Sequence, residues 1–130
     1  MPASGAYTPL VPVRILDTRD GTGRPGGVAG TVGAGVTIDL TCVGVGGVPS
    51  VGVAAVALTV MIIDPTAISW ITMWPQGTVR PVGTANAYFN AAELESAFAV
   101  TKLSADGKAS IYNNAGSVHL VADVAGWFAS

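Results

Sequence analysis

The stretch VAAVALTVMIID, residues 53–64, decides the fold class of this chain. It is apolar at odd and even positions alike, and its Val and Ile residues favour extended strands over helices. Its apolar run, residues 53–63, is also far shorter than the ~20 residues that a membrane-spanning helix needs. We therefore expect a central strand that is buried on both faces, and no membrane insertion.

The segments around this stretch have the periodicity of further strands. In residues 36–42 apolar side chains occupy every second position, which is typical of a half-buried antiparallel strand. Gly- and Pro-rich turns separate the segments, and Asp106-Gly107 predicts a hairpin. We expect an all-β single domain over residues 1–130, an antiparallel β-sandwich or jelly roll of about eight strands. The other six strands are expected at residues 11–18, 68–74, 87–90, 97–103, 109–113 and 118–128.

Two features predict where the first and last strands lie. Pro9 and Pro12 confine the beginning of the first strand to a sheet edge, because proline donates no ladder hydrogen bond. The last strand is too apolar for an exposed edge, so we expect it to pair with the first strand near the centre of a sheet. Its alternation predicts that Phe128 lies on the same face as Leu120 and that Trp127 lies on the opposite face. Residues 1–8 are expected to form an N-terminal arm and residues 21–35 a glycine-rich loop.

The chain carries few charges. Only 11% of its residues are charged, against about a quarter in an ordinary soluble domain, and the net charge is −2. This composition argues against nucleic-acid binding, which needs a basic surface. No basic and apolar leader follows Met1, so an exported form would be a mature fragment or would leave the cell another way. Cys42, the single cysteine, has no partner for an internal disulfide and is expected to pack in the core.

Strands that are apolar on both faces also predict self-association. A two-layer sandwich of this size covers only one face of each sheet, so the second face needs a partner. Because few charges would repel other copies of the chain, we expect identical subunits to cover the second face of each sheet. We expect a homo-oligomer in the form of a trimer, with interface residues Val53, Ile63, Ile71 and Met73.

Three segments carry a resemblance to a known domain. Residues 7–23, YTPLVPVRILDTRDGTG, contain the motif Val-Arg-Ile-Leu-Asp-Thr-Arg, and residues 46–81 and 103–128 continue the pattern. The chain resembles a β-rich domain that recurs, often in tandem, in secreted and cell-surface proteins of actinobacteria. It departs from that pattern at residues 91–96, AAELES, where Gly, Gln and Thr are usual. The resemblance implies a β-sandwich module on cell surfaces, appended to enzymes that act on polysaccharide or cell wall.

The acidic residues of the motif have two interpretations. Asp17 and Asp20 could begin an oxygen cage for calcium, but such a loop usually supplies three or more ligands. The favoured interpretation is structural: Arg14 or Arg19 pairs with Asp17, and Asp20 starts a turn with the following glycine. We therefore expect no metal and no cofactor.

Candidate catalytic groups are sparse. His119 and Asp123 lie on one face of one strand, but four residues of strand span about 13 Å, too far for a hydrogen bond. Glu93 and Glu95 are the closest acid pair, yet they lie in one loop rather than across a cleft. The Gly-x-Gly-x-x-Gly match at residues 21–26 lacks a following helix. We therefore expect that the chain is not an enzyme.

The aromatic residues are the best candidates for ligand binding. Exposed Trp and Tyr rings can stack on sugar rings while amide side chains bind the hydroxyl groups. The alternative is that Trp70, Trp74 and Trp127 fill the core or a subunit interface. The candidate glycan-binding residues are Trp70, Trp74, Tyr88, Tyr112, Asn113 and Asn114.

Two functions follow as expectations. The first is a non-enzymatic extracellular or cell-surface adhesion module that binds envelope or cell-wall glycans, as the resemblance implies. The second is a structural protein of an actinobacteriophage virion, a capsid decoration or tail component built on the same module, with capsid or tail proteins as partners. An uncharged β-protein with two-sided strands suits such an assembly.

Overall fold

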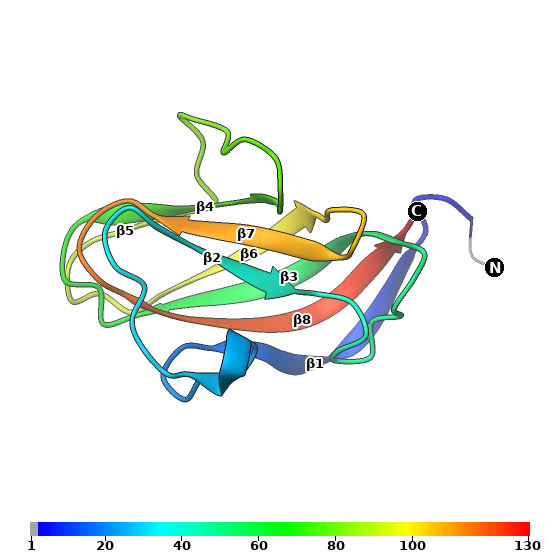
Figure 1. Ribbon diagram of the computed structural model, residues 1–130, viewed down its shortest axis with the longest axis horizontal. Coiled ribbons are helices and arrows are strands. Elements are labelled where there is room, and N and C mark those ends of the chain that lie inside the picture. Colours follow the sequence, from blue (N-terminus) through cyan, green and yellow to red (C-terminus); the bar gives the residue numbers. More distant parts are fainter. Residues whose placement is uncertain (1–2) are drawn as a thin grey trace.

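The computed structural model describes residues 3–130. Within these residues eight strands form two four-stranded antiparallel sheets that pack face to face, with the strand orders β1-β8-β3-β6 and β2-β7-β4-β5 (Figure 1). This confirms the predicted all-β sandwich. The strands are β1 (Tyr7–Asp17), β2 (Val36–Thr41), β3 (Val53–Ile63), β4 (Ser69–Pro75), β5 (Ala87–Phe89), β6 (Glu95–Lys102), β7 (Lys108–Asn113) and β8 (His119–Ala129).

The strand order follows from the sequence patterns. β3, the apolar stretch that decides the fold, lies between β8 and β6 as predicted. β8 lies between β1 and β3, so the first and last strands pair as expected. β1 is an edge strand and begins with the segment that contains Pro9 and Pro12, where a missing backbone donor costs no ladder bond.

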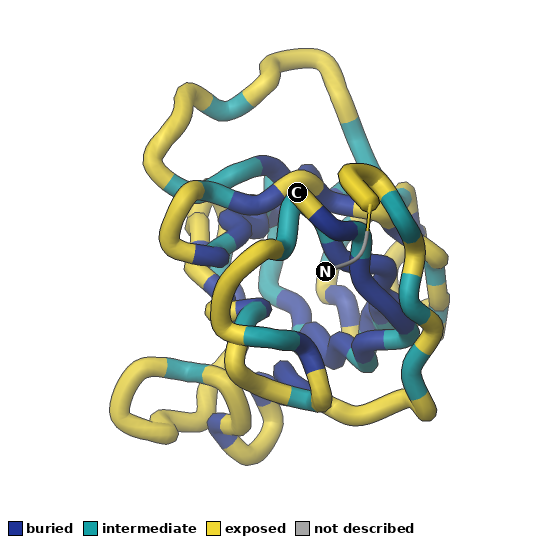
Figure 2. The backbone as a smooth tube through the Cα atoms, turned by 90° about the vertical axis from the view of Figure 1, so that its right-hand side faces the viewer, coloured by how far each residue is buried: buried dark blue, intermediate teal, exposed yellow. Residues whose placement is uncertain are grey.

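The core lies between the sheets and is built from alternate residues of the strands. In the tube of Figure 2, buried segments occupy the middle and exposed loops surround them. Cys42 is among the buried residues as predicted, and burial raises the pKa of its thiol to about 12. Each fully buried Leu or Ile contributes about 1.5–3 kcal/mol. The largest fully buried side chains include Leu16, Leu40, Leu58, Ile62, Ile71, Ile111 and Leu120.

The expected oligomer interface is wrong in half of its residues. Ile71 and Met73 project from β4 into the core, so no partner can contact them. Val53 and Ile63 lie half-buried at the two ends of β3. The Thr72–Trp74 end of the other face of β4 is covered by the loop of residues 76–86, which belongs to the same chain and projects beyond β4 in Figure 1.

A β-bulge in β8 reverses the predicted orientation of its last residues. The register against β3 shifts between Leu58↔Val124 and Ala57↔Gly126, so one extra residue is inserted into β8. Because side chains alternate with a period of two, this insertion turns Trp127 into the core and Phe128 out of it. Phe128 then packs on Tyr7 of β1, with ring centroids 4.8 Å apart.

The first strand is longer than predicted, and the N-terminal arm is correspondingly shorter. β1 begins at Tyr7 rather than Val11, and the main chain of Gly5 and Ala6 bonds to Ala129. Of the predicted arm, residues 1 and 2 lie outside the described residues. In residues 21–35 a short 3-10 turn, η1 (Pro25–Gly27), precedes Val32, which enters the core beside Val118. No helix within residues 3–130 is long and apolar enough to span a membrane.

The bulge gives a stability prediction. A Cβ built on Gly126 meets the ring and hydroxyl of Tyr7, so we expect Gly126→Ala to lower the free energy of unfolding by about 1–3 kcal/mol. In a Tyr7→Ala background the same change should cost much less, because the obstructing ring is gone. Urea denaturation of the four proteins measures this coupling. Equal costs in both backgrounds would contradict the packing described for β1 and β8.

Candidate functional site

Most of the predicted glycan-binding residues lie on the outer face of the β2-β7-β4-β5 sheet. Trp70 of β4 pairs with Tyr88 of β5, and Thr72 of β4 pairs with Tyr112 of β7. Directly paired residues project to the same side of a sheet, and Trp70 and Thr72 are two residues apart. The three aromatic side chains therefore share one side of the sheet, here called the aromatic face.

The aromatic face is held by contacts among its own residues. The rings of Trp70 and Tyr88 have centroids 6.4 Å apart and are tilted by 48°. Tyr88 is 72% exposed, whereas Trp70 is half-buried. The Tyr112 hydroxyl donates to Asn114 Oδ1 at 3.0 Å, and the Arg80 guanidinium lies 3.8 Å from the centre of the Tyr112 ring. This geometry is a cation–π contact, which orients both side chains.

Trp74 does not belong to the exposed part of this face. Its ring is buried, and its indole Nε1 donates to the carbonyl oxygen of Thr78 at 3.1 Å. The adjacent Thr72 hydroxyl donates to the carbonyl oxygen of Thr84 at 2.6 Å. The loop of residues 76–86 thus lies over this end of β4. A ring that is covered in this way cannot stack on a sugar, so the expectation for Trp74 is wrong.

Asn113 is also not a ligand residue. It is fully buried, and its Nδ2 donates to the carbonyl oxygens of Val32, Gly33 and Gly116 at 3.1–3.2 Å. Its Oδ1 accepts a hydrogen bond from Ser69 Oγ at 3.0 Å. Asn113 therefore satisfies backbone groups of the β1–β2 and β7–β8 connections inside the protein. Its place two residues after Ile111 in an alternating strand was the sequence signal for this inward orientation.

Polar residues that the sequence analysis did not select border the aromatic face. Asp39 of β2 pairs with Ser110 of β7, whose hydroxyl donates to the Asp39 carboxylate at 2.7 Å. The alternation of residues 36–42 placed Asp39 on the polar side of its strand, but the strand beside it could not be inferred from sequence. A hollow of about 300 Å³ adjoins them, lined by Gly23, Arg24, Pro25, Asp39, Thr41 and Lys108.

Glu93 and Glu95 line a second hollow, of about 160 Å³, beside Tyr88. A hydrogen bond with Glu93 raises the pKa of the Glu95 carboxyl, because the shared proton favours its neutral form. The two carboxyl groups of a glycoside hydrolase stand about 5 Å or more apart, on either side of the bond that is cleaved. The shared hydrogen bond holds the Glu93 and Glu95 carboxyl groups closer together than that arrangement.

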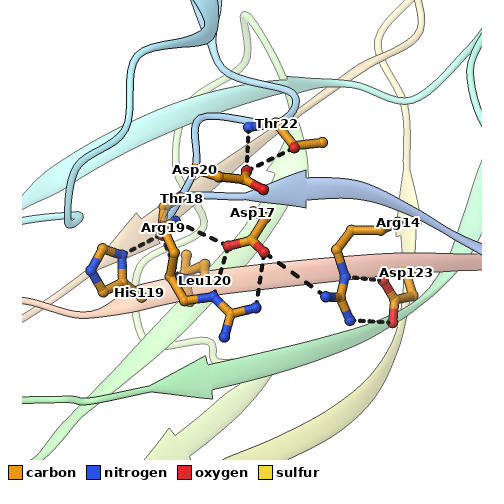
Figure 3. A network of polar contacts seen from close by, with 9 residues as sticks. All are labelled: Arg14, Asp17, Thr18, Arg19, Asp20, Thr22, His119, Leu120 and Asp123. Atoms are coloured by element: carbon orange, nitrogen blue, oxygen red, sulfur yellow. Dashed lines mark hydrogen bonds and ion pairs between the residues drawn. The ribbon is translucent and has the colours of Figure 1, made fainter.

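The motif residues form a polar network where β1 ends against β8 (Figure 3). Asp17 accepts two hydrogen bonds from the Arg19 guanidinium at 2.9 Å and one from the Arg19 main-chain nitrogen at 3.0 Å. These bonds hold the pKa of Asp17 below its ordinary value, although its burial opposes this shift. Arg14 instead makes a bidentate pair with Asp123 of β8, at 2.9 and 3.3 Å, and reaches Asp17 only at 3.9 Å.

Thr18 and His119 complete this network. The main-chain nitrogen of Leu120 donates to Thr18 Oγ1 at 2.9 Å, and the same oxygen lies 2.9 Å from His119 Nδ1. Thr18 is fully buried, and its hydroxyl links the end of β1 to the start of β8 through the hydrogen bond from Leu120. His119 is therefore a hydrogen-bonded residue of the sheet.

The two acidic residues of the possible calcium site use their oxygens within the chain. Asp20 accepts from the main-chain nitrogen of Thr22 at 2.9 Å and from its hydroxyl at 2.7 Å, as in an Asx turn. Asp17 is engaged by Arg19 as described. In the part of the chain that the structure describes, no three His, Cys, Asp or Glu side chains come together as metal ligands could.

Comparisons with protein-family models, with curated proteins and with solved structures found no match for this chain. What the chain can bind is therefore inferred from its own surfaces, and the aromatic face is the strongest candidate.

The buried carboxylate predicts how stability depends on pH. Because the pKa of Asp17 is lower in the folded state than its ordinary value of 3.8, folding is favoured above that value and this contribution is lost as the pH falls through the folded-state pKa. We expect Asp17→Asn to lower the free energy of unfolding at pH 7 by about 2–3 kcal/mol. Urea denaturation at pH 7 and at about pH 3 should show a smaller acid dependence for the variant.

Asp106→Asn is the matched control for this prediction. Asp106 lies in an exposed turn and accepts only from Ser104 Oγ at 3.2 Å. Its replacement should change stability by less than about 0.5 kcal/mol. Equal effects of the two substitutions would show that the Asp17 network adds nothing beyond a surface contact.

Proposed function

We propose that this chain is a non-enzymatic binding module of an extracellular or cell-surface protein, and that its aromatic face binds glycans of a bacterial envelope. The observation that carries the proposal is the gathering of Trp70, Tyr88 and Tyr112, from three strands, on one side of one sheet. The resemblance to surface domains of actinobacteria agrees with this choice of ligand.

The chemistry of the face suits a sugar. An aromatic ring offers a flat apolar surface to the C–H groups of a pyranose, and Trp70 and Tyr88 supply two such rings at an angle. Hydroxyl and amide groups for the sugar hydroxyls stand beside them at Tyr112 and Asn114. Arg80 adds a charged donor on the same face. Ligand sites generally combine an apolar surface with a small number of fixed polar groups.

The positions of the candidate acids and bases support a non-enzymatic role. The hydroxyl group that is hydrogen-bonded to His119 belongs to Thr18, which is fully buried and already accepts from the Leu120 nitrogen. A nucleophile must be accessible to the atom that it attacks. Glu93 and Glu95 share a hydrogen bond rather than facing each other across a bound sugar.

A second candidate is the phage virion protein. The outer face of the other sheet carries Phe98 and Val100, which are 66% and 50% exposed, and few charges surround them on β6. Such a surface suits contacts between neighbouring subunits of a capsid or tail. This assignment requires no small ligand at the aromatic face.

The glycan proposal predicts which substitutions weaken binding. Trp70→Ala and Tyr88→Ala should each reduce binding to purified envelope polysaccharide about tenfold, which corresponds to about 1.4 kcal/mol of lost stacking. Val11→Ala is the control, because Val11 is exposed on the other sheet. A glycan array and a cell-wall pull-down measure the effect. No binding of the unchanged chain above background would contradict the proposal and favour the virion protein.

The non-enzymatic part has a separate test. The purified chain, incubated with cell-wall polysaccharide, should release no reducing ends over background. The assay is repeated with His119→Ala and Glu95→Gln variants, which remove the histidine and one acid of the contact pair. Hydrolysis by the unchanged chain that disappears in either variant would show an active site and would refute the proposal.

A further inference from the structure

The four edge strands of the sandwich differ in how they are protected against pairing with another chain. β1 contains two prolines and two register interruptions, and β5 has only three residues. β2 has the turn segment Gly23–Pro25 beside it, since both line the same hollow. Prolines, bulges, shortness and covering loops are the usual means of blocking an edge. β6 has neither a proline nor a bulge, and it is not short.

β6 is a long and regular edge strand. Its eight residues contain no proline, and its register against β3 runs from Glu95 to Lys102 without a shift. It lies at the end of its sheet, so its second side has no strand beside it. Its outward side chains include the exposed Phe98 and Val100. An exposed apolar edge of this length is a template for strand addition.

The direction of the free backbone groups of β6 can be deduced from one hydrogen bond. The Leu103 nitrogen donates to the Ala54 carbonyl oxygen at 2.9 Å, so residue 103 points its backbone groups toward β3. Because these groups alternate along an antiparallel strand, the odd-numbered residues of β6 bond to β3. The N–H and C=O groups of Phe98 and Val100 therefore point into the open edge.

We propose that β6 pairs antiparallel with β6 of a second copy of this chain. A two-fold axis through Ala99 would place Phe98 of each copy opposite Val100 of the other, so that four large apolar side chains meet on one side of the joined sheet. Paired residues then share the same face, as a continuous sheet requires. The two sheets would continue across the axis as one sheet of eight strands.

The charges at the ends of β6 favour the antiparallel orientation. Glu95 stands at the beginning of the strand with Glu93 close by, and Lys102 stands at its end. An antiparallel copy brings the acidic end of one strand to the basic end of the other. A parallel copy would place like charges side by side. In the proposed register Lys102 lies opposite Ser96 of the other copy, near its acidic end, so the charges favour the antiparallel over the parallel orientation.

This pairing gives a closed dimer rather than the trimer expected from the sequence. A two-fold axis uses the same surface of both copies and leaves no further edge of β6 to extend. Two of the four residues on which the expected interface was based, Ile71 and Met73, lie in the core. The dimer requires neither of them.

Light scattering and substitution of Val100 test the proposal. The unchanged chain should show twice the 13.0 kDa mass of one copy at tens of micromolar. Val100→Lys places a charge at the centre of the pair, and Val100→Pro removes an N–H group that serves only the open edge, so both should give the mass of a monomer. Val11→Lys, at an exposed site on β1, is the control and should remain dimeric.

Amide hydrogen exchange of the unchanged chain gives a second readout that needs no variant. Protection of the amides of Phe98 and Val100 should rise with protein concentration, while the amides of Ala97 and Ala99 stay protected throughout. A monomer at all concentrations, a trimer, or a dimer that persists in both Val100 variants would overturn the proposal. So would equal protection of odd and even residues at every concentration.

Discussion

The Asp17 carboxylate is the group on which the junction of the first and last strands depends. It is only 4% exposed, and a buried carboxylate without donors would be costly, so the main chain of Arg19 and its guanidinium must stay against it. Thr18, held between these two residues, then reaches the start of β8. The Arg14–Asp123 pair contributes less, because it is partly exposed and solvent screens it.

The strands could be predicted from sequence because alternation and turn residues are local signals. The central place of β3 and the pairing of β8 with β1 followed from apolarity alone. The bulge near Gly126 could not be predicted, since one inserted residue reverses every later side chain without changing the composition. The covering of Trp74 depends on where residues 76–86 turn back, which is set by side-chain bonds such as Thr72 to Thr84.

The candidate site was predictable by residue type more than by position. Trp70, Tyr88 and Tyr112 were selected because exposed aromatic rings bind sugars, and the strand register then places them on one face. Arg80 and Asp39 were missed because their nearness to this face depends on loop path and strand order, which no local pattern records. In the proposed dimer both aromatic faces would point the same way, so one polymer could engage two sites and gain avidity.

The pairing of β1 with β8 also has a consequence for how the chain folds during synthesis. Tyr7 lies opposite Phe128, so the first strand made has no partner in its sheet until the last strand has left the ribosome. β3 can pair with β6 earlier, but the position between β3 and β1 stays empty until β8 is made. Contacts between such distant residues form slowly, because the intervening loop must first be closed. The four-stranded order β1-β8-β3-β6 therefore cannot be completed until residues 119–129 emerge, and during that interval the apolar strands that await β8 are prone to aggregation.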